Sequence, residues 1–367
     1  MHRTKKVDTI LATLTAFLVL SGFLVFASAS MGLRTRDGAS YSLVLVKQGV
    51  IALVGIALLL VVATRVPYTF WKQYAPHIFI TTLVLTLLVF VPHVGFSTKG
   101  GTRWIDLRFG TVQPSEFLKL GTVIFLAGYY ARIKNHVTSF VQGFLPFLGV
   151  VGLTAIIMIK QPDIGTFLVL LCAATAVYIA AGARWLHLFF LVLIGVVGVV
   201  VLASIFPHVK DRLETFRNPE QQTLGSSYQV RQSLIAIGSG QLTGRGFGQS
   251  VQKFTYLPEP IGDSIFSVLS EDFGFVGSAL LVILCSIFAL RGLRVSDRSS
   301  DQFGRLLGVG IVILIASQSF INIMALTGII PLTGVPLVFV SQGGTALIMA
   351  FLETGILLNI SKYQIRT

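Results

Sequence analysis

The stretch Ile10–Ala29 reads ILATLTAFLVLSGFLVFASA and contains no charged side chain. A helix needs about 20 apolar residues to cross the hydrocarbon core of a bilayer. The basic start of the chain, Met1–Lys6, also gives it the look of a signal peptide. The run is long for that role and further apolar runs follow it, so an uncleaved first transmembrane helix is favoured.

The composition of the whole chain points the same way. Of its 367 residues, 54% are hydrophobic and only 12% are charged, whereas soluble domains carry roughly 25% charged residues. Backbone groups in lipid must be hydrogen-bonded within the protein, so long apolar runs form helices there. A barrel would show alternating strands of about ten residues, and no such alternation is present. We therefore predict an all-α polytopic membrane protein.

We expect about ten transmembrane helices. Their ranges are 8–30, 41–64, 74–95, 114–133, 140–160, 165–182, 185–206, 264–290, 303–327 and 333–360. The last range is too long and Gly-rich for one plain span, so it should include a broken or re-entrant piece near Pro331–Gly344, buried in protein. The chain is predicted to be a single domain, 1–367. Residues 207–263 form a large polar loop between the seventh and eighth helices.

The charges in the loops predict the orientation. Lys and Arg exceed the acids most strongly in the loops on the side that holds both termini, so that side should be cytoplasmic and 207–263 outside. The net charge of +13 is spread over short loops and does not indicate binding to nucleic acid. Acids gather at the outer helix ends, which favours a site at the outer surface. Cys172 and Cys285 lie in apolar runs and indicate neither a disulfide nor a metal site.

Two polar motifs precede predicted helices. Arg103 is followed by Gln113-Pro114-Ser115-Glu116, with Lys119 one turn further on. A Lys within a span usually faces a polar cavity or a partner, so Lys119 and Arg103 are candidates to grip an anion such as a pyrophosphate. The alternative is a Glu116–Lys119 pair that only fixes the helix end. In Lys160-Gln161-Pro162-Asp163, Asp163 either caps the next helix or pairs with Lys119 or binds a cation.

The polar loop contains three further features. Residues 228–240 are typical of a short amphipathic helix lying on the membrane surface. The glycines of 244–248 are too irregular for a phosphate loop and favour tight turns. Lys253 and Arg245 are expected either to contact phosphates or to extend to lipid headgroups.

Asp263 ends the loop, directly before an apolar span. A carboxylate there lies at the water–lipid boundary, which suits chemistry on a substrate that is half lipid and half polar. Asp263 is a candidate for the helix N-cap, and a helix start also holds a catalytic side chain in a fixed place. Glu271 and Asp272 lie two turns further and need a basic partner or a solvated cavity. Polar residues such as Gln318, Asn322 and Ser341 are expected mainly to join helices.

Taken together, these motifs resemble the polytopic cell-wall proteins FtsW, RodA and SpoVE, the SEDS family. The resemblance covers about Asp8 to Lys362 and leans towards FtsW. Its motifs, in chain order, are Arg103-Trp104-x-Asp106-Leu107, Gln113-Pro114-Ser115-Glu116, Gln161-Pro162-Asp163-x-Gly165-Thr166, Gln232-Ser233-Leu234-Ile235-Ala236-Ile237-Gly238-Ser239-Gly240, Gln252-Lys253-Phe254, Leu257-Pro258-Glu259-Pro260, and Pro331-x-Thr333-Gly334 with Ser341-x-Gly343-Gly344. Ile261-Gly262, Gln342 and Glu353 depart from the family pattern.

The resemblance implies a peptidoglycan glycosyltransferase that polymerises lipid II at the outer face of the bacterial cytoplasmic membrane, in division or elongation. Its expected partner is a class B penicillin-binding protein, a transpeptidase. Asp263 matches the family's essential loop aspartate, and Lys119 and Asp163 match its conserved lysine and Gln-Pro-Asp aspartate. A lipid II flippase and a non-catalytic scaffold are the alternatives.

The expected reaction is inverting and forms a β-1,4 linkage, with Asp263 as general base. Lys119 and Arg103 would stabilise the pyrophosphate leaving group. A divalent cation, Mg²⁺ or Mn²⁺, held by Asp163 or Glu116 is a further expected contributor. Additional candidates for substrate binding are Ser115, Glu116, Asp163, Arg231, Gln232, Lys253 and Glu259.

Overall fold

The computed structural model describes residues 6–35, 41–98, 101–106, 110–217 and 226–364. Each predicted span corresponds to a helix, which confirms the all-α membrane fold. These helices are α1 (Thr9–Ser30), α2 (Tyr41–Arg65), α4 (Ala75–Leu87), α5 (Pro114–Ile133), α6 (Leu145–Lys160), α7 (Ile164–Ala180), α8 (Trp185–Ile205), α12 (Ile265–Asp297), α13 (Gln302–Leu326) and α14 (Gly344–Ser361). Within the described residues, seven helices are long and apolar enough to cross a membrane, and α4 and α7 are shorter.

Shorter elements connect these helices. They are η1 (Met31–Thr35), α3 (Tyr68–Gln73), η2 (Leu88–Phe90), η3 (Lys134–His136), the π-helical turn η4 (Phe140–Phe144), α9 (Pro207–Arg217), α10 (Ser226–Ser239) and α11 (Gln252–Thr255), with strands β1 (Gly95–Thr98), β2 (Gly101–Asp106) and β3 (Thr111–Val112). The expected break before the last helix is confirmed, because no helix runs between the end of α13 and the start of α14.

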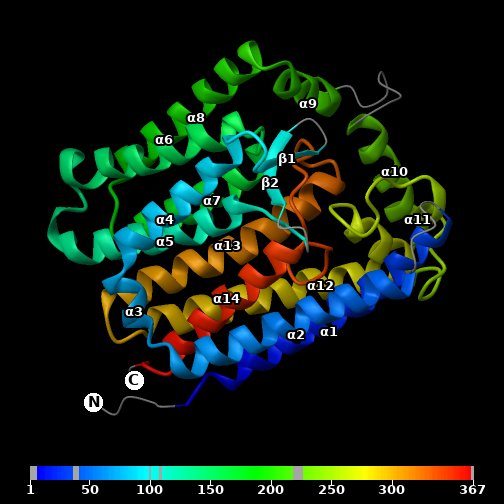
Figure 1. The fold of residues 1–367 in the computed structure, drawn as a ribbon, viewed down its shortest axis with the longest axis horizontal. Helices are drawn as coiled ribbons and strands as arrows, with labels where there is room; N and C mark the ends of the chain where they lie inside the picture. Colours follow the sequence, from blue (N-terminus) through cyan, green and yellow to red (C-terminus); the bar gives the residue numbers. More distant parts are fainter. Residues whose placement is uncertain (1–5, 36–40, 99–100, 107–109, 218–225, 365–367) are drawn as a thin grey trace.

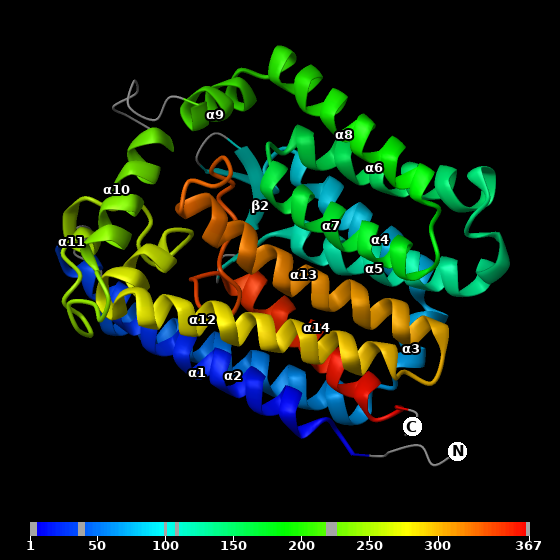
Figure 2. The same ribbon diagram turned by 180° about the vertical axis from the view of Figure 1, so that it is seen from behind.

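The helices differ sharply in how much of their surface the protein covers. α13 lies in the middle and packs against α5, α7 and α12, while α14 packs against α2 (Figures 1 and 2). α8 lies at the edge, and His187 is its one buried side chain. A helix that is apolar all round and unburied fits contact with lipid.

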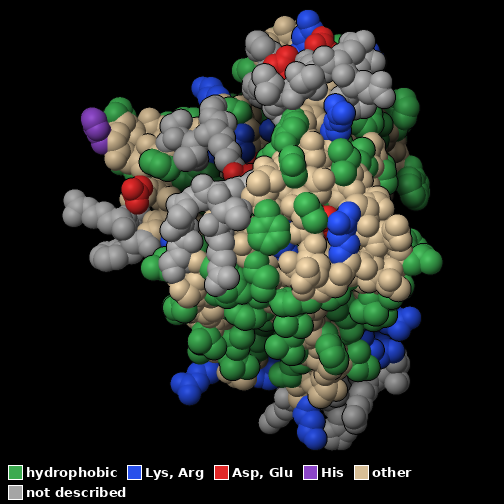
Figure 3. Space-filling view, turned by 90° about the vertical axis from the view of Figure 1, so that its right-hand side faces the viewer, with side chains coloured by type: hydrophobic (Ala, Val, Ile, Leu, Met, Phe, Trp, Pro, Cys, Tyr) green, Lys and Arg blue, Asp and Glu red, His purple; other side chains and the backbone are tan. Residues whose placement is uncertain are grey.

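The two ends of the helical bundle carry different parts of the chain. Both termini lie at one end, and α10 and α11 lie at the other, with α9 and the small sheet also towards that end (Figure 1). Figure 3 looks onto the α10–α11 end, where acidic and basic side chains are scattered among hydrophobic and neutral ones. That both termini share one end agrees with the prediction, while the membrane face they occupy stays a prediction from loop charges.

The sheet was not predicted. Its order is β1-β2-β3 and both pairings are antiparallel, with Gly95 opposite Ile105 and Ile105 opposite Val112. Its strands are too short to show an alternating pattern in the sequence. The sheet matters for the site because it carries Arg103 on β2.

A kink in α12 anchors the polar loop. Gly274 has φ 65° and ψ −162°, a conformation essentially restricted to glycine. The backbone hydrogen bonds freed at the kink are taken up by the loop, since the N–H groups of Phe275 and Val276 donate to the carbonyl oxygens of Gln241 and Leu242 at 2.8 and 3.1 Å. The span that was expected as one helix at 264–290 is therefore two helices joined at Gly274.

Candidate functional site

Asp263 lies in the turn that leads into α12. The N–H groups of Gly262 and Ser264 donate to the carbonyl oxygen of Glu259 at 3.0 and 3.2 Å, which closes the turn. Ser264 occupies the N-cap position, so the interpretation of Asp263 as the cap is wrong by one residue. The half-buried Asp263 side chain accepts a hydrogen bond from Gln229 Nε2 of α10 at 3.2 Å.

The backbone around Asp263 is held by polar side chains from the C-terminal third of the chain. Asn322 Nδ2 donates to the carbonyl oxygens of Asp263 and Val335, at 2.7 and 2.8 Å. Ser341 Oγ donates to the carbonyl oxygen of Gly262 at 2.7 Å. This confirms that these polar residues join separate segments. Several independent hydrogen bonds of this kind keep the carboxylate in one place.

A second carboxylate, Asp163, precedes α7. Its Oδ2 accepts hydrogen bonds from Gln113 Nε2 at 2.9 Å and from Ser115 Oγ at 3.0 Å. Its Oδ1 lies 3.9 Å from Arg103 Nη1. Asp163 occupies the N-cap position of α7, as expected, but its side chain makes no capping hydrogen bond. Its basic partner is Arg103, where Lys119 was expected.

Arg103 itself is fixed by the backbone of the Gln161–Pro162 turn. Its Nε donates to the carbonyl oxygen of Gln161 at 3.0 Å, and its Nη2 donates to that of Pro162. The guanidinium therefore has a set orientation beside Asp163, and its side chain is 23% exposed.

Lys119 lies deeper, inside the bundle. Its Nζ is 2.9 Å from Glu116 Oε2 and donates to Gln318 Oε1 at 2.5 Å. Lys119 and Glu116 are both buried. The buried Glu353 of α14 also interacts electrostatically with both of them. The predicted Glu116–Lys119 pair is confirmed.

Arg212 was not predicted as a site residue. It extends from α9 and interacts electrostatically with Asp163, Asp263 and Arg103. Burial lowers the pKa of Arg212, the nearby Arg103 lowers it further, and the two aspartates raise it. The one signal in the sequence is that Arg212 lies three residues after Val209 and four before Phe216, so it shares their helix face.

A groove of about 1060 Å³ opens beside the turn that carries Asp263. Its lining includes Glu259 and Gly262 from the Asp263 turn and Trp104 from β2. Apolar side chains of α2, such as Val44 and Ile51, line it too. The groove thus combines an apolar wall with polar groups that include the Glu259 side chain, which suits a ligand that has a lipid part and a polar part.

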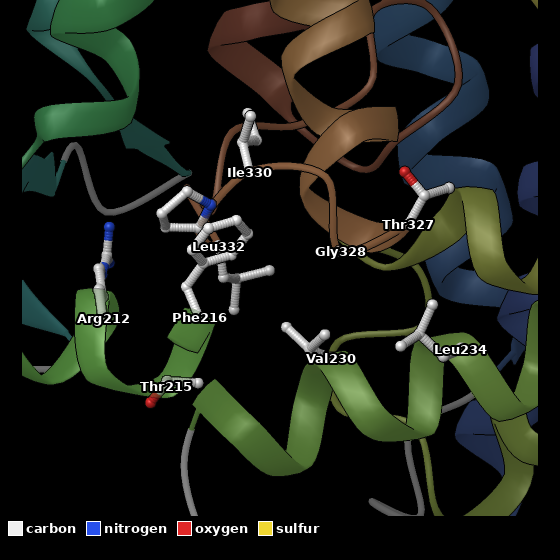
Figure 4. Close-up of a pocket in the computed structure, with 10 residues that line it drawn as sticks. Arg212, Thr215, Phe216, Val230, Leu234, Thr327, Gly328, Ile330 and Leu332 are labelled. Atoms are coloured by element: carbon white, nitrogen blue, oxygen red, sulfur yellow. The ribbon is translucent and has the colours of Figure 1, made fainter. Parts of the chain in front are cut away.

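A smaller pocket of about 140 Å³ lies under α9 and α10. Figure 4 shows Arg212 projecting from α9 at one edge, while Val230 and Leu234 project from α10 into the pocket. Ile330 and Leu332, from the segment after α13, lie on the opposite side.

Lys253 is placed away from any surface. It is fully buried, with its Nζ 3.6 Å from Asp272 Oδ1 and donating to Ser28 Oγ at 3.0 Å. This corrects the expectation that Lys253 reaches a phosphate or a headgroup. Arg245 Nε lies 3.3 Å from Glu271 Oε1, so both deep acids of α12 have the basic partner that was expected.

The two remaining candidates lie on α10, whose helical structure was predicted. Arg231 is exposed and Gln232 is partly buried. Gln229, on the same helix, is the residue that contacts Asp263.

A metal site is the least supported of the expectations. Among the residues that the structure describes, no cluster of three or more His, Cys, Asp or Glu side chains is arranged to hold an ion. Asp163 is taken up by Gln113, Ser115 and Arg103, and Glu116 by Lys119.

Comparison with known proteins agrees with this architecture. Residues 8–366 match the sequence model of the FTSW_RODA_SPOVE family, described as "Cell cycle protein". Stage V sporulation protein E of Bacillus subtilis is 38% identical, covering 98% of this chain and 99% of its own. A "Probable peptidoglycan glycosyltransferase FtsW" of Geobacter sp. is 33% identical, covering 98% of both chains. A solved structure described as "Structural coordination of polymerization and crosslinking by a peptidoglycan synthase complex" has a TM-score of 0.80 and 23% identity, with 98% of this chain and 99% of that chain covered, so the fold is shared.

Proposed function

The chain belongs to the FtsW/RodA/SpoVE family of cell cycle proteins, and we propose that it is a peptidoglycan glycosyltransferase that polymerises lipid II. One observation carries the proposal: the Asp263 carboxylate is held at the start of a helix, in a turn whose residues Glu259 and Gly262 line a groove of about 1060 Å³ with one apolar wall. Lipid II is a disaccharide peptide on a prenyl pyrophosphate, so it has the two kinds of surface that the groove offers.

In the proposed reaction, Asp263 acts as general base. It takes the proton from the 4-hydroxyl of the acceptor sugar, whose oxygen then attacks the anomeric carbon of the donor. The bond between that carbon and the pyrophosphate oxygen breaks, and prenyl pyrophosphate leaves. An α-linked donor that gives a β-1,4-linked product undergoes inversion, which needs one base and no covalent intermediate on the enzyme.

The leaving pyrophosphate needs positive charge nearby. Arg103 supports this role, because its guanidinium is fixed by two backbone carbonyls and is partly exposed. Lys119 is buried against Glu116 and Gln318, so we propose that it acts through its field and not by contact. Asp163 orients Arg103 and is a positioning residue.

The predicted Mg²⁺ or Mn²⁺ ion does not fit these residues well. Asp163 already receives two hydrogen bonds and faces a guanidinium, and Glu116 already pairs with Lys119. A metal would have to displace these partners, so we route no step of the reaction through one.

The setting of the reaction is also proposed. The excess of Lys and Arg around the termini supports a cytoplasmic location for both of them, which puts Asp263 at the outer face of the cytoplasmic membrane. The groove lets prenyl tails remain in the bilayer while the sugars reach Asp263. A class B penicillin-binding protein is the proposed partner, since the matching solved structure is described as a complex for polymerization and crosslinking.

The test is glycan synthesis by the purified protein from lipid II, with Asp263→Asn and Asp297→Asn as a matched pair. Asp297 is 72% exposed and pairs with Arg305 at the far end of α12. We expect Asp263→Asn to lose roughly 10²–10⁴-fold in rate, and Asp297→Asn to keep normal activity. Normal polymerisation by Asp263→Asn would disprove the base. Flipping of lipid II in liposomes without glycan products would favour a transporter. Absence of both flipping and glycan synthesis would favour a scaffold.

A further inference from the structure

A cleft with apolar walls lies between α1 and α2, which run side by side along one edge of the bundle (Figures 1 and 2). This α1–α2 cleft has a volume of about 270 Å³, and Gln48 is the one polar side chain among the described residues that line it. Leu20 and Leu53 of its lining are largely exposed, so the cleft opens on a surface that faces lipid. It follows α2 from Gln48 to Ile56, about 12 Å at the helical rise of about 1.5 Å per residue.

The floor of the α1–α2 cleft is formed in part by the segment between α13 and α14. Phe339 of this segment has φ 65°, a left-handed conformation that a bulky residue rarely adopts. Its ring packs edge to face against Phe351 of α14, with the ring centroids 5.6 Å apart. Its carbonyl group lies so close to α1 that a methyl group added at Gly22 would overlap the oxygen. Backbone strain that the surrounding packing holds in place is enriched where proteins bind ligands.

Gln48 connects the α1–α2 cleft to the large groove. It is buried and lines both of them. Its Nε2 donates to the carbonyl oxygen of Ser341 at 3.4 Å, and Ser341 Oγ donates to the carbonyl oxygen of Gly262. Two hydrogen bonds therefore link the cleft to the residue that precedes Asp263. A hydrocarbon chain in the cleft would have its polar end in the groove, beside the turn that carries Asp263.

The groove has a cation where the cleft joins it. Lys47 precedes Gln48, is exposed and lines the groove. It is the only charged residue of α2 before Arg65, in the last turn. A lysine within a span usually faces a polar cavity or a partner. Among the described residues that line the groove, Glu259 is the only other charged one.

We propose that the α1–α2 cleft binds the prenyl chain of a lipid-linked substrate and that Lys47 binds the phosphate next to that chain. This inference rests on the proposed function, in which the substrate is anchored by a prenyl pyrophosphate. The phosphate follows the last prenyl carbon directly, so a chain that leaves the cleft at Gln48 brings it to Lys47. The chain contributes affinity by burying apolar surface, and the lysine contributes a charged hydrogen bond.

The test measures the dissociation constants of farnesyl pyrophosphate and inorganic pyrophosphate for the full chain in phosphatidylcholine nanodiscs, corrected with empty discs. Gly49→Leu is the variant that fills the cleft. A methyl group added at Gly49 has Phe23 as its nearest neighbour, at 4.0 Å, so a side chain starts there without a clash. Gly198→Leu is the matched control, because a methyl group at Gly198 on the exposed α8 has no neighbour within 4 Å among the described residues.

For Gly49→Leu we expect the dissociation constant of farnesyl pyrophosphate to rise by roughly tenfold and that of inorganic pyrophosphate to stay unchanged. Lys47→Gln should raise both constants by roughly tenfold. Arg65→Gln, which removes an exposed charge from the other end of α2, should match the wild type, as should Gly198→Leu. Undecaprenyl pyrophosphate in the discs should compete with farnesyl pyrophosphate, and dioleoyl phosphatidic acid should compete far less.

The outcomes separate this inference from the proposed function. A wild-type constant for farnesyl pyrophosphate in Gly49→Leu, or an equal loss of inorganic pyrophosphate, would overturn the prenyl site, and a wild-type constant in Lys47→Gln would overturn the phosphate contact. Equal competition by phosphatidic acid would make the cleft a general lipid site and refute the proposal. Where Gly49→Leu does not fold, Gly49→Ala decides by the same comparison. A wild type that binds as expected but makes no glycan would refute the proposed function alone.

Discussion

Two carboxylates near the start of α12 have opposite surroundings. Asp272 is 1% exposed and is enclosed by Lys253, Ser28 and the N–H of Ser250. Asp263 lies nine residues earlier in the chain. It is half-buried, and Glu259 and Gly262 of its turn line an open groove. Each acid interacts with a basic residue from the same polar loop: Lys253 Nζ lies 3.6 Å from Asp272 Oδ1, and Arg212 interacts electrostatically with Asp263.

The difference shows how one segment serves two purposes. An enclosed carboxylate with its donors in place stabilises the fold, because breaking any contact leaves a buried charge uncompensated. A carboxylate at an opening can exchange its partners for those of a substrate. The cluster around Asp272 joins α1, α11 and α12. It thereby fixes the polar loop that ends at Asp263.

The largest expected effect tests the enclosed cluster. Lys253→Met should lower the unfolding free energy in bicelles by about 3–5 kcal/mol, since Asp272 would be left buried without its cation. Removing the acid as well, in Lys253→Met/Asp272→Leu, should restore part of the loss. The control is Lys210→Met, which removes an exposed pair and should cost about 0–1 kcal/mol. Equal losses from Lys253→Met and Lys210→Met would refute a structural role for the enclosed cluster.

The next largest effect is expected on the activity of the site around Asp263 and Asp163. Asp163→Asn should reduce kcat/KM for polymerisation by roughly 10²-fold, because Arg103 would lose the carboxylate that orients it. Its unfolding temperature should change far less than that of Lys253→Met. Asp211→Asn, an exposed acid of α9, is the matched control and should leave the rate unchanged. A large loss of stability with little loss of activity would instead group Asp163 with the enclosed cluster.

The sequence could predict those parts of the site that are local in the chain. Ser115, Glu116 and Lys119 lie within about one helical turn, so their closeness follows from helix geometry alone. The position of Asp263 also followed from the change from a polar loop to an apolar span. The helices themselves could be predicted because lipid demands long apolar runs.

The rest depends on contacts that are distant in the chain. Gln229 contacts Asp263, and Arg212 interacts with it electrostatically, only because α9 and α10 fold over the end of the bundle. The faces of these helices can be read from the sequence, but not what each face packs against. Lys253 looked available for a phosphate, yet its true partners are Asp272 and Ser28 from two other helices. Charge in a sequence indicates that a partner is needed but not which one.

The smallest expected effect is the pH dependence of the enclosed cluster. The pKa of Lys253 is lowered from 10.5, chiefly by burial, although Asp272 and Glu271 act in the opposite direction. Between that lowered pKa and 10.5, the unfolded chain binds a proton that the folded chain does not, so stability should rise with pH. The contribution stays below about 1.4 kcal/mol per pH unit. Thermal unfolding from about pH 8 upwards should therefore show a more positive slope for the wild type than for Lys253→Met, and a more negative one would mean that the ion pair outweighs burial.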